Sequence, residues 1–281
     1  MSIIKCRDKR LDTDEHTLIM GILNVTPDSF SDGGKNFRSS DAVRRALEMV
    51  QEGADIIDIG GESTRPGYTP VSPDEEIRRI VPVIEAVSEI SDAVISVDTY
   101  KASVAEEALK AGAHIINDIY GLLYDPLMAE TVVRYDAGVV LMFNTRRNGM
   151  TGSEDIVTRA IREVTGSIET AKAAGISEEY IITDPGVGFT PSRDDDLRLM
   201  ENIDRFSFGK RFPVLLGCSR KRVAASLLAH ESVPEERDNI SIGLALGGVA
   251  KGASILRVHN VKATKEVLDG YERIVRNEKN L

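Results

Sequence analysis

Eight short apolar runs alternate with helical stretches along this chain, and that repeat constrains the possible fold more than any other feature. The apolar runs have the length of buried strands, and the stretches between them show helical periodicity. The apolar runs are Leu18–Asn24, Asp55–Gly60, Val94–Asp98, His114–Asp118, Val139–Asn144, Tyr180–Asp184, Pro213–Ser219 and Ser254–His259. The helical stretches are Ser40–Glu52, Pro73–Glu89, Lys101–Ala111, Pro126–Tyr135, Glu154–Ala174, Asp194–Asn202, Arg220–Ala229 with Glu235–Lys251, and Lys262–Arg276. This order predicts an α/β fold with a parallel sheet, and eight strand–helix units are the number that closes a barrel.

The chain length agrees with a single barrel. A (β/α)8 barrel, or TIM barrel, takes about 250 residues, and this chain has 281. We therefore predict one domain over residues 1–281, with the barrel proper at about 18–276 and a short hairpin or extended arm at 1–17. The alternative is an open, doubly wound sheet, which is disfavoured because no GxGxxG motif follows the first strand.

Composition and charge exclude several classes of protein. The formal net charge is −10 and no tract is rich in Lys or Arg, which argues against a nucleic-acid partner. The two cysteines do not suggest an oxidised secreted scaffold, and no apolar stretch has the length of a membrane span. The N-terminus lacks the apolar core of a signal peptide. We expect a soluble cytoplasmic protein without a membrane partner, in which local positive groups hold any anionic ligand.

Polar residues end the apolar runs, at the carboxyl ends of the strands, where barrel enzymes place their active sites. These residues are Asn24, the loop Gly60–Gly67, Asp98, Asn117, Asn144, Asp184, Ser219 and the pair Arg257 and His259. Any one of them alone is more simply a turn former or a helix cap. Side chains alternate along a strand, so if Val97, Ile116 and Ile181 face the helices, the polar groups converge in the barrel mouth. The combination predicts a polar site there.

Two loops add candidate residues. The stretch Met20–Gly34, MGILNVTPDSFSDGG, runs from a buried strand into a long polar loop that contains Phe30. Loops of that length in compact domains are often lids or binding loops. GGESTRPG, Gly60–Gly67, places Arg65 in the middle of a turn-rich loop.

A third segment, GCSRKR at Gly217–Arg222, is expected to lead from a strand directly into a helix. The N–H groups and dipole at such a helix start favour an anion. Ser219 is the expected N-cap of this helix, and Lys221 either reaches back to a ligand or is solvated.

Seven motifs together resemble one known family. They are MGILNVTPDSFSDGG, DIIDIGGESTRPG, ISVDT, AHIINDI, ITDPGVGF, LLGCSRKR and ILRVHNV. They are similar to the motifs of the dihydropteroate synthases and cover nearly the whole chain. The resemblance implies a TIM barrel, a homodimer and a target of sulfonamide drugs. It also implies a transferase of folate biosynthesis, which joins 6-hydroxymethyl-7,8-dihydropterin diphosphate to p-aminobenzoate, releasing diphosphate, with Mg²⁺ as the cofactor.

The resemblance also implies roles for individual residues. The pterin pocket falls on Asp98, Asn117, Met142, Asp184, Phe189 and Lys221. The diphosphate side falls on Asn24, Thr64, Arg257 and His259, with Asn24 as a ligand of Mg²⁺. The aminobenzoate side falls on Phe30, Thr64, Arg65, Pro66, Phe189 and Ser219. The residues expected to act in catalysis are Asp98, Asp184, Lys221, Arg257 and His259. Two loops, Val25–Gly34 and Glu62–Gly67, are expected to close over the substrates.

One motif departs from the family pattern. After the fifth strand the family often has Met-His-Met or Met-His-Asn, whereas this chain has Met142, Phe143 and Asn144. The replacement puts any role of this loop in doubt, although it removes no residue that the expected chemistry needs.

Two other functions compete with the synthase. A pterin-binding methyltransferase would share the pterin carboxylates but has no use for a diphosphate site, so Asn24, Arg257 and His259 disfavour it. A non-catalytic pterin-binding paralogue is disfavoured because Asn24, Lys221 and Arg257 are all present.

Overall fold

A computed structural model of the chain describes residues 3–26, 35–62, 70–146 and 154–275. Within these ranges, eight parallel strands form one sheet in the order β8-β7-β6-β5-β4-β3-β10-β9. The strands are β3 (Leu18–Asn24), β4 (Ile56–Gly60), β5 (Val94–Asp98), β6 (Ile115–Asp118), β7 (Gly138–Met142), β8 (Ile181–Asp184), β9 (Leu215–Leu216) and β10 (Ile255–Val258). A parallel bridge between Thr183 and Val214 joins β8 to the segment before β9. The bridge brings the two edges of the sheet together, so the predicted barrel is confirmed and the open sheet is excluded.

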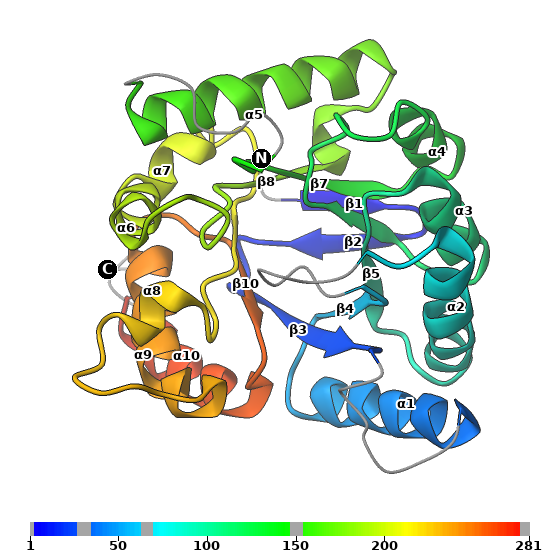
Figure 1. The fold of residues 1–281 in the computed structure, drawn as a ribbon, viewed down its shortest axis with the longest axis horizontal. Coiled ribbons are helices and arrows are strands. Elements are labelled where there is room, and N and C mark those ends of the chain that lie inside the picture. The colour runs from blue at the N-terminus through cyan, green and yellow to red at the C-terminus, as the bar shows by residue number, and fades with distance from the viewer. Residues whose placement is uncertain (1–2, 27–34, 63–69, 147–153, 276–281) are drawn as a thin grey trace.

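Helices surround this sheet on its outer side (Figure 1). They are α1 (Lys35–Gln51), α2 (Pro73–Ile90), α3 (Ala102–Lys110), α4 (Met128–Arg134), α5 (Ile156–Ala173), α6 (Arg193–Glu201), α7 (Ile203–Phe206), α8 (Arg222–Ala225), α9 (Asp238–Ala250) and α10 (Val261–Val275). Short 3-10 helices occupy Glu178–Tyr180 and Pro234–Arg237. The starts of α2, α5 and α6 are capped by the side chains of Ser72, Asp155 and Ser192, each of which accepts a backbone N–H.

Two predicted helix boundaries are wrong. The first helix begins at Lys35 rather than Ser40. The helix expected over Arg220–Ala229 is reduced to the four residues of α8, Arg222–Ala225. Arg220 cannot begin it, because its φ of 59° lies outside the right-handed helical region.

The alternation of side chains divides the apolar residues into two cores. One lies between the sheet and the helices and includes Val97, Ile116 and Ile181. The other fills the barrel interior and includes Ile115 and Ile182. The predicted orientation of these strands is therefore confirmed, and the polar residues that alternate with the outer-core residues point into the barrel.

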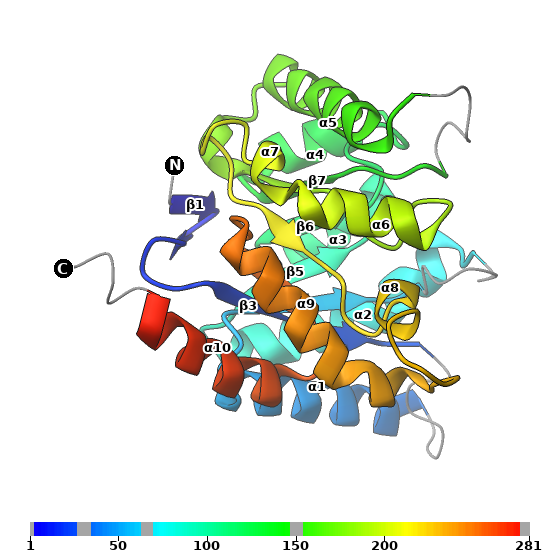
Figure 2. The same ribbon diagram turned by 90° about the vertical axis from the view of Figure 1, so that its left-hand side faces the viewer.

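The N-terminal residues close one end of the barrel. Strands β1 (Ile3–Cys6) and β2 (Lys9–Asp12) form an antiparallel hairpin, as predicted. Ile4 and Cys6 are fully buried against the interior core, and the Arg7 guanidinium donates to carbonyl oxygens at the end of α3 and beyond it. Figure 2 shows the hairpin at one end of the barrel, with α8 towards the other. The hairpin does not cover the opposite end of the barrel, where the carboxyl ends of the strands lie and where a ligand site is expected.

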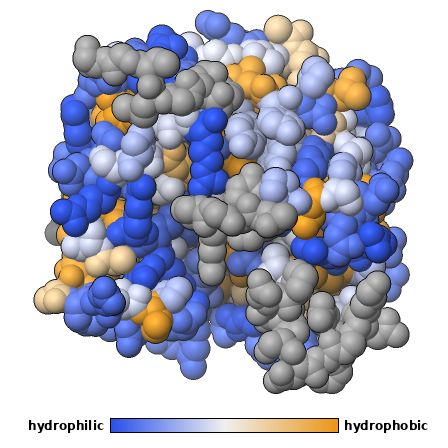
Figure 3. Space-filling view, in the orientation of Figure 1, coloured by the Kyte–Doolittle hydropathy of each residue, from blue (hydrophilic) through white to orange (hydrophobic). Residues whose placement is uncertain are grey.

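One face of the molecule is mostly polar. Figure 3 shows a largely hydrophilic face with small, scattered hydrophobic groups. None of the described helices is long and apolar enough to cross a membrane.

Candidate active site

Arg257 links two carboxylates inside the barrel. Its Cα on β10 is in register with Met20 of β3, and its side chain extends from there towards the barrel mouth. The guanidinium Nε donates to Asp58 Oδ2 at 2.6 Å, and Nη2 donates to Asp98 Oδ2 at 2.8 Å. Charge-assisted bonds of this kind hold a side chain in one orientation. Residues from β4, β5 and β10 are thereby fixed to one another.

Asn117 and Asp98 stand side by side at the mouth, since they pair in register across β5 and β6. Asn117 Nδ2 donates to Asp58 Oδ2 at 3.1 Å. Burial raises the pKa of Asp98, and the negative charge of Asp58 raises it too, while Arg257 opposes the shift. Within the described residues, Asp98 Oδ1 has no hydrogen-bond partner although it is buried. A buried acceptor of that kind is expected to meet a donor on a ligand or water.

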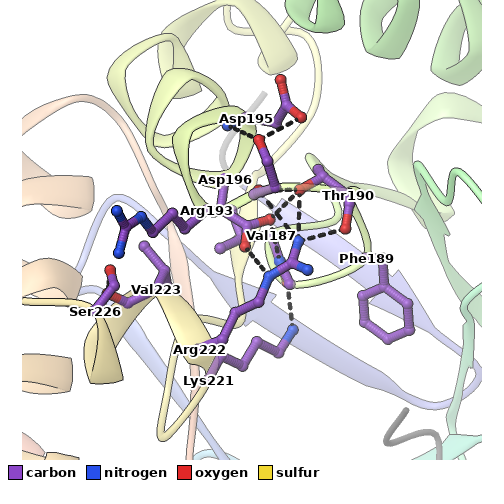
Figure 4. A network of polar contacts seen from close by, with 12 residues as sticks. Val187, Phe189, Thr190, Arg193, Asp195, Asp196, Lys221, Arg222, Val223 and Ser226 are labelled. Carbon is purple, nitrogen blue, oxygen red and sulfur yellow. Dashed lines mark hydrogen bonds and ion pairs between the residues drawn. The ribbon is translucent and has the colours of Figure 1, made fainter. Parts of the chain in front are cut away.

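Asp184 and Lys221 are two further charged groups at the mouth, and each acts electrostatically on the other. Burial raises the pKa of Asp184 to about 6, although the charge of Lys221 and an N–H from Gly186 oppose the shift. Burial lowers the pKa of Lys221 to about 8, and Asp184 opposes that shift. Lys221 Nζ donates to the carbonyl oxygen of Val187 at 2.5 Å (Figure 4). Lys221 is therefore held against the loop after β8 rather than extended into solvent.

Gly188 makes room for this lysine. A Cβ at Gly188 would lie 2.4 Å from Lys221 Cδ, and the φ of Gly188 is +87°, which glycine alone adopts freely. Any side chain at position 188 would displace the lysine. The packing of Lys221 therefore explains why the ITDPGVGF motif has a glycine at this position.

An apolar cluster borders the charged groups. Met142 at the end of β7 and Phe189 after β8 pack together with Tyr100 and Ile119. Lys221 Nζ lies 4.8 Å from the centroid of the Phe189 ring. Met142 and Phe189, which are predicted to line the pterin pocket, thus lie together and next to Lys221, a predicted polar group of the same pocket.

Ser219 does not cap a helix, so that prediction is wrong. Its hydroxyl lies 3.0 Å from His259 Nδ1, and it also accepts the backbone N–H of His259 at 3.3 Å. The position before α8 is occupied by Lys221, whose side chain makes no capping bond. With only four residues, α8 also provides little of the dipole expected to attract an anion.

The two arginines of GCSRKR bond neighbouring parts of the protein and not the site. Arg220 makes two bonds to Asp238, at 2.7 and 3.0 Å. Arg222 reaches across to the loop after β8, where it bonds Asp196 Oδ2 at 3.0 Å and Thr190 Oγ1 at 2.9 Å (Figure 4). Among the described residues of this motif, Lys221 is the cation that is turned to the site.

Phe143, which replaces the usual histidine of the family motif, belongs to the hydrophobic core. It is 1% exposed, belongs to the core between sheet and helices, and has the Arg159 guanidinium 6.0 Å from its ring centroid. Asn144 is buried and donates to the Ile119 carbonyl oxygen at 3.1 Å. The side chain of Phe143 therefore packs between the sheet and the helices rather than in the barrel interior.

Several predicted site residues lie outside the described residues. They are Phe30, Thr64, Arg65 and Pro66. Of the two loops expected to close over the substrates, the structure describes Val25, Thr26 and Glu62. Asn24 is described: it is half-buried, ends β3, and pairs in register with Gly60.

Two polar groups were missed by the sequence reasoning. Asp58 lies in the middle of an apolar run, yet its inward direction could have been inferred because it alternates with Ile57 and Ile59. Lys101 Nζ bonds both Glu62 Oε2 at 2.7 Å and Glu76 Oε2 at 2.6 Å. This second group joins residues far apart in sequence, and no local pattern predicts it.

Comparison with known proteins identifies the family. Residues 20–259 match the sequence profile described as "Pterin binding enzyme". A Bacillus subtilis protein named dihydropteroate synthase is 46% identical over 260 residues, covering 92% of this chain and 89% of that protein. The chain belongs to the dihydropteroate synthase family. The family predicted from the motifs, and with it the transferase function, is confirmed.

Solved structures of the family agree with the fold. A dihydropteroate synthase from Xanthomonas albilineans with 4-aminobenzoic acid has a TM-score of 0.91 and 38% identity, over 97% of this chain and 98% of that one. A structure of that enzyme in complex with 7,8-dihydropteroate has a TM-score of 0.88 and 36% identity, over 97% of this chain and 98% of that one. At these identities the likeness extends beyond the fold to the family.

Proposed function

We propose that the chain condenses 6-hydroxymethyl-7,8-dihydropterin diphosphate with p-aminobenzoate, giving 7,8-dihydropteroate and diphosphate. One observation carries the proposal: half-buried Arg257 bonds Asp98 at the barrel mouth and Asp58 one layer deeper, and Asp184 and Lys221 act on one another electrostatically nearby. The mouth thus offers acceptors to a heterocycle and cations to an anionic group. The names of the related structures, with 4-aminobenzoic acid and with 7,8-dihydropteroate, support the same pair of substrates.

The pterin ring presents a row of N–H and amino donors. We assign Asp98, Asn117 and Asp184 as their acceptors, because carboxylate and amide oxygens suit such donors. Asp98 Oδ1, which is buried without a partner among the described residues, fits this role. Lys221 would donate to the oxo group and a ring nitrogen, and Met142 and Phe189 would contact the ring face.

The diphosphate would lie against Asn24, Thr64, Arg257 and His259. The Arg257 guanidinium has five N–H donors, and its bonds to Asp58 and Asp98 use two of its nitrogens. Donors therefore remain for an anion. The proposed Mg²⁺ fits this arrangement: Mg²⁺ keeps several waters and often takes few protein ligands plus substrate phosphates. The Asn24 amide oxygen can be such a ligand, and the bound ion would neutralise charge on the leaving group.

We propose a dissociative reaction. The bond between the exocyclic carbon and the diphosphate oxygen breaks first, and diphosphate leaves with the electron pair. Asp98 and Asp184 stabilise the resulting cation, which is delocalised into the ring, while Arg257 and His259 stabilise the leaving diphosphate. The amine nitrogen of p-aminobenzoate then attacks the carbon and loses a proton to water. That amine is neutral, so no strong general base is needed.

The aminobenzoate would lie between Phe30, Thr64, Arg65, Pro66, Phe189 and Ser219, with Arg65 pairing with its carboxylate. Arg65→Ala is therefore expected to raise the KM for p-aminobenzoate by about 10-fold or more, the scale of a lost charged hydrogen bond. The KM for the pterin substrate should change little. Steady-state kinetics with each substrate varied in turn measures both, and equal losses for the two substrates would refute the assignment of this loop.

We further propose that the protein is a homodimer that pairs through α9. This helix carries one charged residue, Asp238, in DNISIGLALGGVA. Gly243 and Gly247 are exposed, and a Cβ built at either meets nothing within 4 Å. Half-buried Leu244 and Leu246 continue this apolar surface. A second copy is its proposed partner.

A charge at Gly243 should therefore weaken the dimer. Gly243→Glu is expected to shift the protein to monomer in sedimentation velocity, because a carboxylate would be buried in an apolar contact. Gly166→Glu on α5 is the matched control, since a Cβ there also meets nothing within 4 Å. A dimer that survives Gly243→Glu would show that this face is not the interface.

A cytoplasmic location and inhibition by sulfonamides complete the proposal. Cys6 and Cys218 are both free and buried, as thiols in a reducing compartment are. A sulfonamide would compete with p-aminobenzoate for its part of the site.

Diphosphate release tests the proposal. Release should require both substrates and increase with Mg²⁺. If the chain were a methyltransferase, it would transfer a methyl group to a corrinoid protein and release no diphosphate. If it were a non-catalytic paralogue, it would bind pterin with neither activity.

A further inference from the structure

We propose that Asp58 is a positioning residue of this site: one buried carboxylate oxygen orients both Arg257 and Asn117 from beneath the pocket. The proposal rests on the roles assigned above to Arg257, Asn117 and Asp98. Asp58 lies within the motif DIIDIGGESTRPG but was given no role in the site, and nothing in the proposed reaction requires it to contact a substrate.

Asp58 lies deeper in the barrel than the residues assigned to the substrates, and its Oδ1 is buried without a hydrogen-bond partner among the described residues. Its side chain is 0% exposed. In the register of β4 and β5, Asp58 pairs with Ser96, whereas Gly60 pairs with Asp98. Because side chains alternate, Asp58 lies one inward-facing layer below the position that Asp98 occupies. We therefore assign the effect of Asp58 on the reaction to the two residues that its Oδ2 contacts, Arg257 and Asn117.

A single oxygen of Asp58 contacts two of those residues. Oδ2 accepts from Arg257 Nε at 2.6 Å and from Asn117 Nδ2 at 3.1 Å. The first bond aims the guanidinium so that Nη2 reaches Asp98. The second fixes the orientation of the Asn117 amide, which turns its oxygen away from Asp58 and leaves it to accept from a ligand. An uncharged group at 58 would hold both side chains less firmly.

Asp58 also contributes to the charge around Asp98. The groups that act on Asp98 come from four places: Arg257 on β10, Asp58 on β4, Glu76 on α2, and Lys221 before α8. Asp58 and Glu76 raise the pKa of Asp98, and the two cations lower it. Removing the charge of Asp58 should therefore lower that pKa, and an arginine released from Asp58 would act in the same direction.

The decisive variant is Asp58→Asn, which keeps the shape and removes the charge. We expect kcat to fall about 10- to 100-fold, as misplacement of catalytic groups does. The KM for p-aminobenzoate should stay near its wild-type value. The acid limb of the kcat/KM profile should move to lower pH by about 1 unit, the scale of one nearby charge.

Glu163→Gln is the matched control. Glu163 is also a buried carboxylate paired with an arginine, since Arg159 Nε donates to its Oε1 at 2.8 Å on α5. This pair lies in the outer helix layer, so its loss should leave the pH profile unchanged. If the wild-type protein and Glu163→Gln release no diphosphate, the proposed function fails. If both are active and Asp58→Asn keeps their pH profile, the inference about Asp58 is wrong.

Asp58→Glu covers the case in which Asp58→Asn does not fold. It keeps the charge but moves the oxygen by about one methylene, so kcat should fall about 10-fold or more while the acid limb stays at the wild-type pH. Circular dichroism establishes that each variant is folded. A folded Asp58→Glu with wild-type kcat would overturn the proposal.

Discussion

Replacing Asp98 by asparagine is expected to lower kcat by about 10²- to 10³-fold, the usual effect of removing one group that stabilises charge in the transition state. The KM for the pterin substrate should change much less than kcat, because the asparagine oxygen still accepts a hydrogen bond from the ring. The reason is that Asp98 is assigned to the cation that forms when diphosphate leaves, and asparagine keeps the shape without the charge. Steady-state diphosphate release at saturating p-aminobenzoate measures both constants.

Asp118→Asn is the control for this variant. Asp118 is a fully buried carboxylate on the adjacent strand, but its oxygens accept the backbone N–H groups of Tyr120 and Leu122, both at 2.8 Å. It therefore supports a turn, and its loss should not reduce kcat as Asp98→Asn does. A raised KM with unchanged kcat in Asp98→Asn would mean that this carboxylate only binds the ring.

Replacing Arg257 by methionine is expected to destabilise the protein by about 3–5 kcal/mol, the usual result of removing one partner from a buried ion pair. Asp58 and Asp98 would both remain buried without their counter-charge. Activity should also fall, since the diphosphate loses a donor. Urea unfolding followed by circular dichroism measures the change in the free energy of unfolding.

The loss of stability in Arg257→Met should depend on pH, because it is caused by buried carboxylates that have lost their counter-charge. Burial already raises the pKa of Asp98 in the folded state, and Arg257 opposes that shift, so without Arg257 the folded-state pKa of Asp98 rises further. Stability then falls as pH rises through that range, and the deficit of Arg257→Met should shrink as pH is lowered from about 8 to 5. The double variant Asp58→Asn with Arg257→Met should recover part of the loss. A deficit that is independent of pH would show that packing, not charge, causes it.

Repetition and alternation are what made the fold predictable. Eight strand–helix units predicted closure, and the period of two predicted that Asp98, Asn117, Asp184 and Arg257 point inwards, as the division of the cores requires. The repeat of strand–helix units and the alternation of side chains can both be read from neighbouring residues, and both are found in the folded barrel.

Tertiary contacts decided the rest. Ser219 has the residue type and position of a helix cap, but its hydroxyl bonds His259, forty residues along the chain. Asp58 looks like an ordinary interruption of an apolar run until the barrel places Arg257 opposite it. Lys101, just before α3, joins Glu62 in the segment after β4 to Glu76 in α2. Such pairings follow from strand order, which the sequence pattern alone does not determine.

A crystal structure of the chain with the dihydropterin diphosphate and Mg²⁺ tests the central claim most directly. The account predicts that the ring lies within hydrogen-bond distance of Asp98, Asn117 and Asp184, with the diphosphate against Arg257 and His259. A substrate bound elsewhere, such as in the charged groove between α1 and α10 lined by Glu52, Lys262 and Lys265, with the mouth left to water, would contradict it.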